Sequence, residues 1–240
     1  MIELIDFSKS YKKGSFTVKR INLKANNGEI TGLLGLNGEG KTTVIKAITL
    51  QHFATEGKIF LTDKDGTVFN AQENEEKAKL VTGYVPEQLS FPERLTVNEF
   101  VLLLKIQFSV SDDFFNELLK LCSLTDVLSK KIKTLSKGYR QRLGFFQALI
   151  NSPQNIVLDE PMNGLDPAQI IQMRSLIKKI AETKTVLIST HLMQEVELLC
   201  TKSYVLHNGS IVLSGTKKEI LEKTGESSME NAFLKVTEKK

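Results

Sequence analysis

The residues best suited to chemistry lie in a glycine-rich segment, residues 35–42, with the sequence GLNGEGKT. Its fixed positions match the pattern G-x-x-x-x-G-K-[ST] in full. Glycines at this spacing let backbone N–H groups converge on phosphate oxygens, and the start of the next helix adds partial positive charge. Lys41 can bridge the β- and γ-phosphates of a nucleoside triphosphate, and the Thr42 hydroxyl can ligate Mg²⁺. We call residues 35–42 the phosphate loop. The residues expected to bind the nucleotide are Gly35, Asn37, Gly38, Glu39, Gly40, Lys41, Thr42 and Thr43.

A second candidate group is the carboxylate pair Asp159 and Glu160, which follows the apolar residues 156–158. A buried strand would deliver Asp159 to its end, where a carboxylate can hold the hydration shell of the metal ion. Glu160 could then polarise the attacking water as a general base. An apolar run that ends in Asp-Glu is weak evidence alone, but together with the phosphate loop it predicts nucleotide hydrolysis.

The elements that would position these groups alternate between strand and helix patterns. An apolar run at residues 30–34 precedes the phosphate loop, and helical spacing begins near Lys41, which is the context that the phosphate-binding pattern requires. Residues 2–7 and 21–25 alternate like half-buried strands, and residues 155–158 and 185–189 read as strands around a helix at about 167–181. Asn208 and Gly209 separate two apolar runs, which predicts a hairpin.

The middle and the end of the chain have different patterns. From Thr96 to about residue 149 the apolar spacing is mostly helical, with cap signals at Thr96 and Ser111 and phenylalanines expected in a core. Residues 74–80 are polar and charged, which predicts a surface excursion. The last residues, 217–240, are helical in places, with Phe233 and Leu234 as possible anchors.

Residues 135–142, LSKGYRQR, resemble the signature segment of ATP-binding-cassette (ABC) ATPases, normally written L-S-G-G-Q. The segment lies between the phosphate loop and Asp159, in the order and at the separation that the family pattern expects. Ser136 and Gly138 would stand at a helix start and form a second anion-binding end. In the family this end faces the γ-phosphate held by the opposite subunit, so the resemblance implies a dimer that binds two ATP·Mg²⁺.

Other positions can be carried over from the family one at a time. Tyr11 occupies the place of the aromatic residue that stacks on adenine. Residues 163–166, NGLD, look like the D-loop, which couples the two sites across the dimer. His191 looks like the switch histidine that contacts the γ-phosphate, so the resemblance implies a catalytic role for it.

The family's Q-loop usually reads Pro-Gln, with the glutamine contacting metal and water. Here the sequence is Pro86-Glu87-Gln88, so either Glu87 or Gln88 could take that role, and Gln88 is the preferred candidate. The resemblance thus implies Thr42, Asp159 and Gln88 as the residues near the metal ion.

The resemblance also implies the fold class and the organisation of the chain. We expect an α/β protein with a P-loop NTPase (RecA-like) core, an N-terminal antiparallel β subdomain and an inserted α-helical subdomain. Residues 1–240 would form a single ABC ATPase domain. Its parts would be residues 1–86 and 150–215 (core with β subdomain), 87–149 (inserted region with the helical signature subdomain) and 216–240 (C-terminal tail).

Composition excludes several other classes. With 41% hydrophobic and 25% charged residues among 240, the chain is not a disordered protein. A net charge of +4 is too small to argue for nucleic acid, so no nucleic acid partner is expected. Apolar runs stay well short of the ~18 residues of a membrane span, and Cys122 and Cys200 give no disulfide framework. We therefore expect a soluble, cytoplasmic chain.

The function implied is that of an ATPase subunit that drives transport through an integral membrane permease and is held at the inner face of the cell membrane. The signature wording, the Pro-Glu variant and the end of the tail resemble exporter-associated ATPases of the ABC-2 type. Homodimer and heterodimer assembly both remain open, as does the transported substrate. Two alternatives are a soluble cassette ATPase acting on ribosomes or chromosomes, and a module that binds ATP without hydrolysing it.

Overall fold

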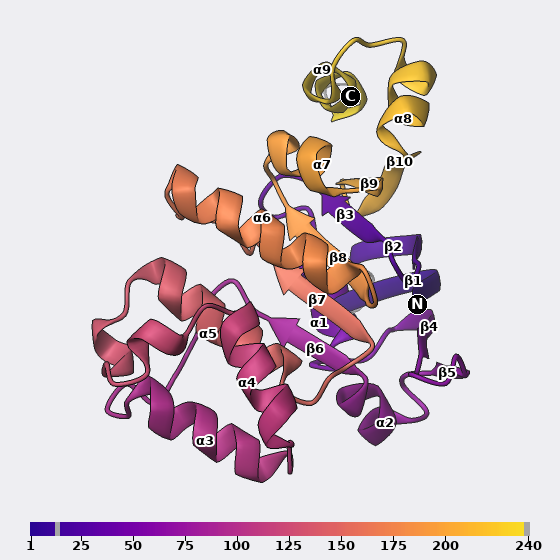
Figure 1. Cartoon of the computed structure of the whole chain (residues 1–240). Helices are drawn as coiled ribbons and strands as arrows, with labels where there is room; N and C mark the ends of the chain where they lie inside the picture. Colours follow the sequence, from indigo (N-terminus) through magenta and orange to yellow (C-terminus); the bar gives the residue numbers. More distant parts are fainter. Residues whose placement is uncertain (13–14, 238–240) are drawn as a thin grey trace.

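The structure, a computed structural model, describes residues 1–12 and 15–237 (Figure 1). Its central sheet has the strand order β10-β9-β3-β8-β7-β6, and all neighbouring pairs are parallel except the hairpin β9–β10. Strands β3, β7 and β8 are buried along their whole length, which explains their nearly continuous apolar sequences. The strands are β3 (Ile30–Leu34), β6 (Thr82–Val85), β7 (Asn155–Asp159), β8 (Thr185–Thr190), β9 (Lys202–His207) and β10 (Ser210–Gly215).

A second, antiparallel sheet has the order β2-β1-β4-β5. Its strands are β1 (Ile2–Lys12), β2 (Ser15–Ala25), β4 (Glu56–Thr62) and β5 (Val68–Asn70). It packs with helix α1 (Lys41–Ile48) in one core that reaches Val157 and Leu187 of the central sheet. The pairing of β1 with β2 shifts register repeatedly, and such irregularities break the alternation of side chains. The sequence pattern therefore predicted only part of each strand, residues 2–7 and 21–25.

The opposite face of the central sheet is covered by α6 (Pro167–Ala181), while α7 (Met193–Leu199) lies beside β3 and β8 (Figure 1). Ile156 and Ile188 face the α6 side, whereas Val157 and Leu187 face α1. The sheet is therefore buried between two layers, as the alternation of side chains along a strand requires.

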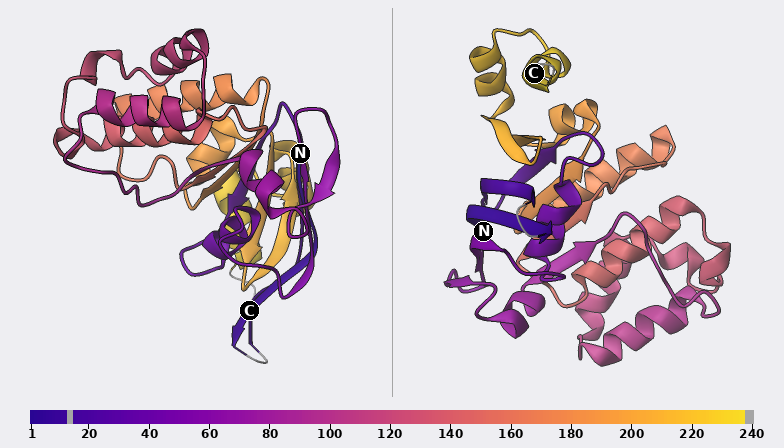
Figure 2. Two further views of the ribbon diagram at one scale, coloured as in Figure 1. Left: turned by 90° about the horizontal axis from the view of Figure 1, so that it is seen from below. Right: turned by 180° about the vertical axis from the view of Figure 1, so that it is seen from behind.

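Three helices, α3 (Val97–Gln107), α4 (Asp112–Leu121) and α5 (Lys137–Leu149), form a helical layer remote from the antiparallel sheet (Figure 2). Short 3-10 helices at Thr125–Val127 and Ile132–Thr134 connect α4 to α5. The predicted caps are confirmed, because Thr96 forms a capping box with Glu99 and Ser111 accepts a hydrogen bond from the backbone N–H of Phe114. Together these elements give an α/β fold with a P-loop NTPase core and a helical insertion, as the sequence predicts.

Residues 74–80 lie mostly at the surface, as predicted, and within them Glu75–Leu80 form α2, a short helix with acidic residues in its first turn and lysines in its last. In the tail, α8 (Lys217–Thr224) and α9 (Met229–Thr237) pack near α7. Phe233 is buried there as predicted, but Leu234 is 43% exposed and does not anchor the helix.

The last residues of the tail, 238–240, lie outside the described residues. In the part of the chain that the structure describes, no helix has both the length and the apolar character that a bilayer crossing requires.

Candidate functional site

The phosphate loop connects the buried end of β3 to the start of α1. Gly38 and Gly40 have positive φ angles of 89° and 105°, a region that glycine enters without strain. A Cβ atom on Gly40 would also lie 2.5 Å from Cγ1 of Val18 in β2. No side chain caps the start of α1, so the partial positive charge there faces the loop. Backbone conformation and packing thus shape a site for an anion.

Lys41, the first residue of α1, is 5% exposed and folds back over the loop. Its ammonium donates hydrogen bonds to the carbonyl oxygens of Gly35 (2.8 Å) and Leu36 (3.3 Å). It also lies 3.3 Å from Oε1 of Glu160. The lysine is therefore held at the loop as a buried cation, beside the residue predicted to be the general base.

Asp159 ends β7 and pairs with Ser189 in the neighbouring strand β8. Burial raises the pKa of the Asp159 carboxyl; the hydrogen bond from Ser189 Oγ (2.5 Å) opposes this, and the charges of Glu160 and Glu87 add to it. A buried carboxylate with two acidic neighbours suits a divalent cation, whose charge would oppose this rise in pKa. Thr42, an exposed residue in the first turn of α1, carries a hydroxyl that would be a second oxygen ligand on the loop side.

Glu160 lies between the phosphate loop and the end of β8. Its Oε2 is 2.9 Å from Nδ1 of His191, and its backbone N–H donates to the carbonyl of Ser189. The residue has a φ of 48°, uncommon outside glycine and frequent at functional sites. Oε1 is buried and accepts no hydrogen bond from the described residues, and the Lys41 ammonium lies 3.3 Å from it. A carboxylate oxygen that accepts no hydrogen bond, beside a cation, fits a site in which the carboxylate would bind water and the cation a phosphate.

A cavity of about 190 Å³ opens between the phosphate loop and Glu160, and neither Asp159 nor His191 is among its lining residues. Glu87 lines it, whereas Gln88, the residue preferred from sequence, is exposed and does not. Glu87 also accepts a hydrogen bond of 3.1 Å from Nδ2 of Asn163, in the segment that resembles the D-loop. The preference for Gln88 is thus not supported by the geometry. The predicted residues that line the cavity are Asn37, Gly38, Gly40, Lys41, Thr42, Thr43 and Glu160, and Thr17 of β2 joins them without a prior sequence signal.

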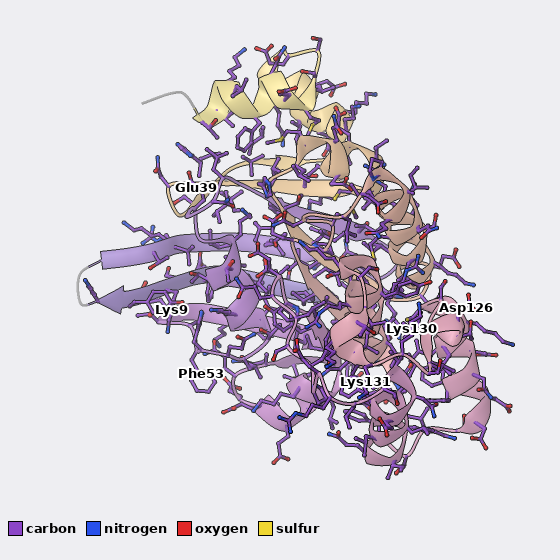
Figure 3. All side chains as sticks on the ribbon, turned by 90° about the vertical axis from the view of Figure 1, so that its left-hand side faces the viewer. Lys9, Glu39, Phe53, Asp126, Lys130 and Lys131 are labelled. Carbon is purple, nitrogen blue, oxygen red and sulfur yellow. The ribbon has the colours of Figure 1, made fainter. Side chains whose placement is uncertain are left out.

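Glu39 was expected to bind the nucleotide, but its side chain faces the β9–β10 hairpin (Figure 3). Its carboxylate lies 3.1 Å from Nδ1 of His207 and accepts a hydrogen bond from the backbone N–H of Asn208. The residue therefore ties the phosphate loop to the turn between these strands, and its side chain is directed away from the cavity.

Tyr11 is 57% exposed near the end of β1. Its ring packs edge-on against His52 with the centroids 5.7 Å apart, and the ammonium of Lys9 lies 5.4 Å from its centroid. Lys9 is itself fixed by a 2.8 Å hydrogen bond to the carbonyl of Phe53 (Figure 3). The exposed ring is thus held in place and is available for stacking on a base.

The signature segment lies at the start of α5. Ser136 is the N-cap residue, and Gly138 is packed so closely that a Cβ there would meet the Gln169 side chain at 2.6 Å. Among the described residues, neither Ser136 nor Gly138 lines the cavity at the phosphate loop of its own chain. This separation is what a site completed by a second chain would require.

The sequence matches the family described as ABC transporter over residues 18–163, which is more than half of the chain. The chain belongs to the ABC transporter family. It is 34% identical over 215 residues to the bacitracin transport ATP-binding protein BcrA of Enterococcus faecalis, covering 88% of this chain and 68% of BcrA. It is 31% identical over 223 residues to the lipopolysaccharide export system ATP-binding protein LptB of Escherichia coli K12, covering 90% and 91%. It spans only 64% of the length of the ABC transporter ATP-binding protein sll0415 of Synechocystis, with 32% identity.

Solved ABC transporter structures have the same fold. An ATP-binding subunit of an ABC transporter superposes with a TM-score of 0.86 at 27% identity, covering 98% of this chain and 99% of that one. A bacterial ABC transporter cassette solved as a dimer, MJ0796, gives a TM-score of 0.76 at 28% identity over 90% and 98% of the two chains. The fold is therefore that of an ABC transporter cassette.

Proposed function

We propose that this chain is an ATP-hydrolysing subunit of an ABC transporter. The observation that carries the proposal is Glu160, a buried carboxylate that lies 3.3 Å from Lys41 and 2.9 Å from His191. The Glu160 carboxylate thus contacts both Lys41, a cation suited to bind the terminal phosphates, and His191, an imidazole suited to orient the carboxylate. The transport and export systems in the names of BcrA and LptB support the same function.

The roles of the remaining groups follow from their positions. Lys41 turns from the loop carbonyls to the phosphates when ATP enters, which frees Oε1 of Glu160 to accept a proton from water. His191 holds the other oxygen and reaches the γ-phosphate. Thr42 and Asp159 would hold Mg²⁺, which when bound neutralises charge on the phosphates. Glu87, at the position directly after Pro86, takes the Q-loop role in place of Gln88.

Two chains complete two sites. Ser136 and Gly138 present the start of α5 to the γ-phosphate bound by a partner chain, because they lie away from the phosphate loop of their own chain. Tyr11 stacks on the adenine in the same chain. The dimeric MJ0796 cassette, which has the same fold, supports this arrangement.

Phosphate release from ATP by the purified chain tests the proposal. With Mg²⁺ we expect steady turnover, and chelation by EDTA should lower it by about 100-fold or more, since a metal ion supplies several kcal/mol of charge stabilisation. ATP binding without any phosphate release in the presence of Mg²⁺ would contradict the proposal and favour a nucleotide-sensing module.

The membrane partner is expected at a cavity of about 570 Å³ between α2, β6, α3 and α5. Leu80, Leu104 and Phe108 are among its lining residues. Leu103 and Ile106, which precede the lining residues Leu104 and Gln107 on α3, are 55% and 75% exposed. Exposed apolar side chains beside an open cavity suit an apolar helix of a permease. Through this contact the chain would be held at the inner face of the membrane and drive transport, which we propose to be export of the ABC-2 type.

The double variant Leu103→Glu with Ile106→Glu should lose the permease, because two carboxylates cannot be buried in an apolar contact without a large cost. We expect recovery of the permease with the tagged chain to fall about tenfold, while ATPase activity without the permease stays within about twofold. Val68→Glu, at a 51% exposed residue on β5, is the matched control. Equal recovery of the permease with both variants would place the docking surface elsewhere.

A further inference from the structure

An ion pair joins α6 to α7 behind the candidate site. Nε of Arg174 lies 3.1 Å from Oε2 of Glu195, and its Nη2 lies 2.7 Å from Oε1. Both carboxylate oxygens are therefore engaged by one guanidinium, the planar two-bond geometry that fixes relative orientation as well as distance. Glu195 is only 4% exposed, so this charge is buried and depends on its partner.

Helix α6 begins directly after residues 163–166, and helix α7 begins shortly after His191, so each helix follows a segment that contacts the candidate site. The segment that resembles the D-loop ends at Asp166, which caps α6 by accepting a hydrogen bond of 2.9 Å from the backbone N–H of Gln169. Helix α7 starts two residues after His191. The turn from His191 into α7 is stabilised by the backbone N–H of Leu192, which donates a hydrogen bond of 3.0 Å to the hydroxyl of Thr190. A link between α6 and α7 is thus a link between residues 163–166 and His191.

Packing between these segments leaves almost no free space. Glu195 shares with Glu160, Asn163 and Leu192 the lining of a cavity of only about 10 Å³. A space of this size holds about one water molecule at most. Because protein interiors are close-packed, a shift of α7 relative to α6 is transmitted to the residues around Glu160.

We propose that Arg174 and Glu195 are positioning residues for ATP hydrolysis, acting through His191 and the D-loop segment. The pair makes the two segments move as one unit, so that His191 keeps its contact with Glu160 while residues 163–166 keep theirs with Glu87. This inference rests on the proposed function, because it assigns a role in the same reaction. Neither side chain contacts the cavity at the phosphate loop.

The test compares Arg174→Met and Glu195→Gln with the wild-type chain. Each should lower kcat about 10- to 100-fold, as expected when a reacting group is displaced by a fraction of an ångström to one ångström. The Kd for ATP should stay within about threefold, since the phosphate loop is untouched. Arg174→Lys keeps the charge but loses the two-bond geometry, so it should recover only part of kcat.

A double variant separates positioning from folding. Arg174→Met combined with Glu195→Met removes both charges, so its melting temperature should stay near that of the wild type. Its kcat should nevertheless be as low as that of either single variant, because both disrupt one link. Lys218→Met, at the exposed pair with Glu222 (3.9 Å), is the control and should leave kcat unchanged.

The outcomes distinguish this inference from the proposed function. An active wild-type chain whose kcat is unaffected by all Arg174 and Glu195 variants would overturn the positioning role alone. So would a kcat that recovers in the double variant together with its melting temperature. A wild-type chain that releases no phosphate would overturn the proposed function and this inference with it.

Discussion

Glu160→Gln is expected to lower ATP turnover by about 10²- to 10⁴-fold, the usual contribution of a positioned general base. Glutamine has the size of glutamate and can still hydrogen-bond to His191, but it cannot take a proton from water. It also removes the charge that lies 3.3 Å from Lys41, so the lysine is free to hold phosphate. ATP should therefore bind at least as tightly as in the wild type and remain intact.

The Glu160→Gln chain should also form a stable dimer in ATP. If two chains enclose two ATP molecules, uncleaved ATP keeps them together, and the Glu160→Gln chain should elute as a dimer in ATP and as a monomer without it. Phosphate release and size-exclusion chromatography measure the two effects. Glu182→Gln, an exposed residue at the end of α6, is the control. Turnover of the Glu160→Gln chain at the wild-type rate would refute the general-base role.

Lys41→Met is expected to raise the Kd for ATP by about 100-fold or more, equivalent to about 2.7 kcal/mol. The lysine is buried, and its present partners are two carbonyl oxygens and Glu160, which ATP phosphates would replace. Without the cation, the polyphosphate would approach the Glu160 carboxylate with no compensating charge.

Titration calorimetry with a slowly hydrolysed ATP analogue measures this Kd. Lys46→Met is the matched control, because Lys46 lies on the same helix but is exposed. An ATP affinity of Lys41→Met within about threefold of the wild type would contradict the role of the phosphate loop.

The parts of the fold that were predicted from sequence are those with a local cause. A buried strand, a glycine loop and a helix follow one another around Lys41, and Thr96 and Glu99 form their capping box within one turn. Such signals lie within a few residues of each other, so one sequence is enough to read them. The helical conformation of Glu75–Leu80 was not predicted from the sequence, because this helix buries little more than Ala78 and so lacks a periodic apolar pattern.

Predictions of side-chain direction were weaker, because they depend on distant partners. Glu39 faces His207, which is 168 residues away in the sequence, and no local pattern reveals that contact. Glu87 and Gln88 are adjacent polar residues after Pro86, and they are distinguished only by contacts with distant parts of the chain: the bond from Asn163 and the cavity at the phosphate loop, which Glu87 lines. Arg174 and Glu195, on two different helices, carry no recognised spacing and became visible only through their contact.

Co-purification of the tagged chain from its native membranes in mild detergent tests the central claim, that this ATPase drives a membrane permease. We expect a protein with several membrane spans at comparable stoichiometry, lost in the Leu103→Glu, Ile106→Glu variant and retained in Val68→Glu. Its identity would narrow the transported substrate. Recovery of ribosomes or DNA, or of the chain with no membrane protein at all, would contradict the transport function and leave only an ATPase of another kind.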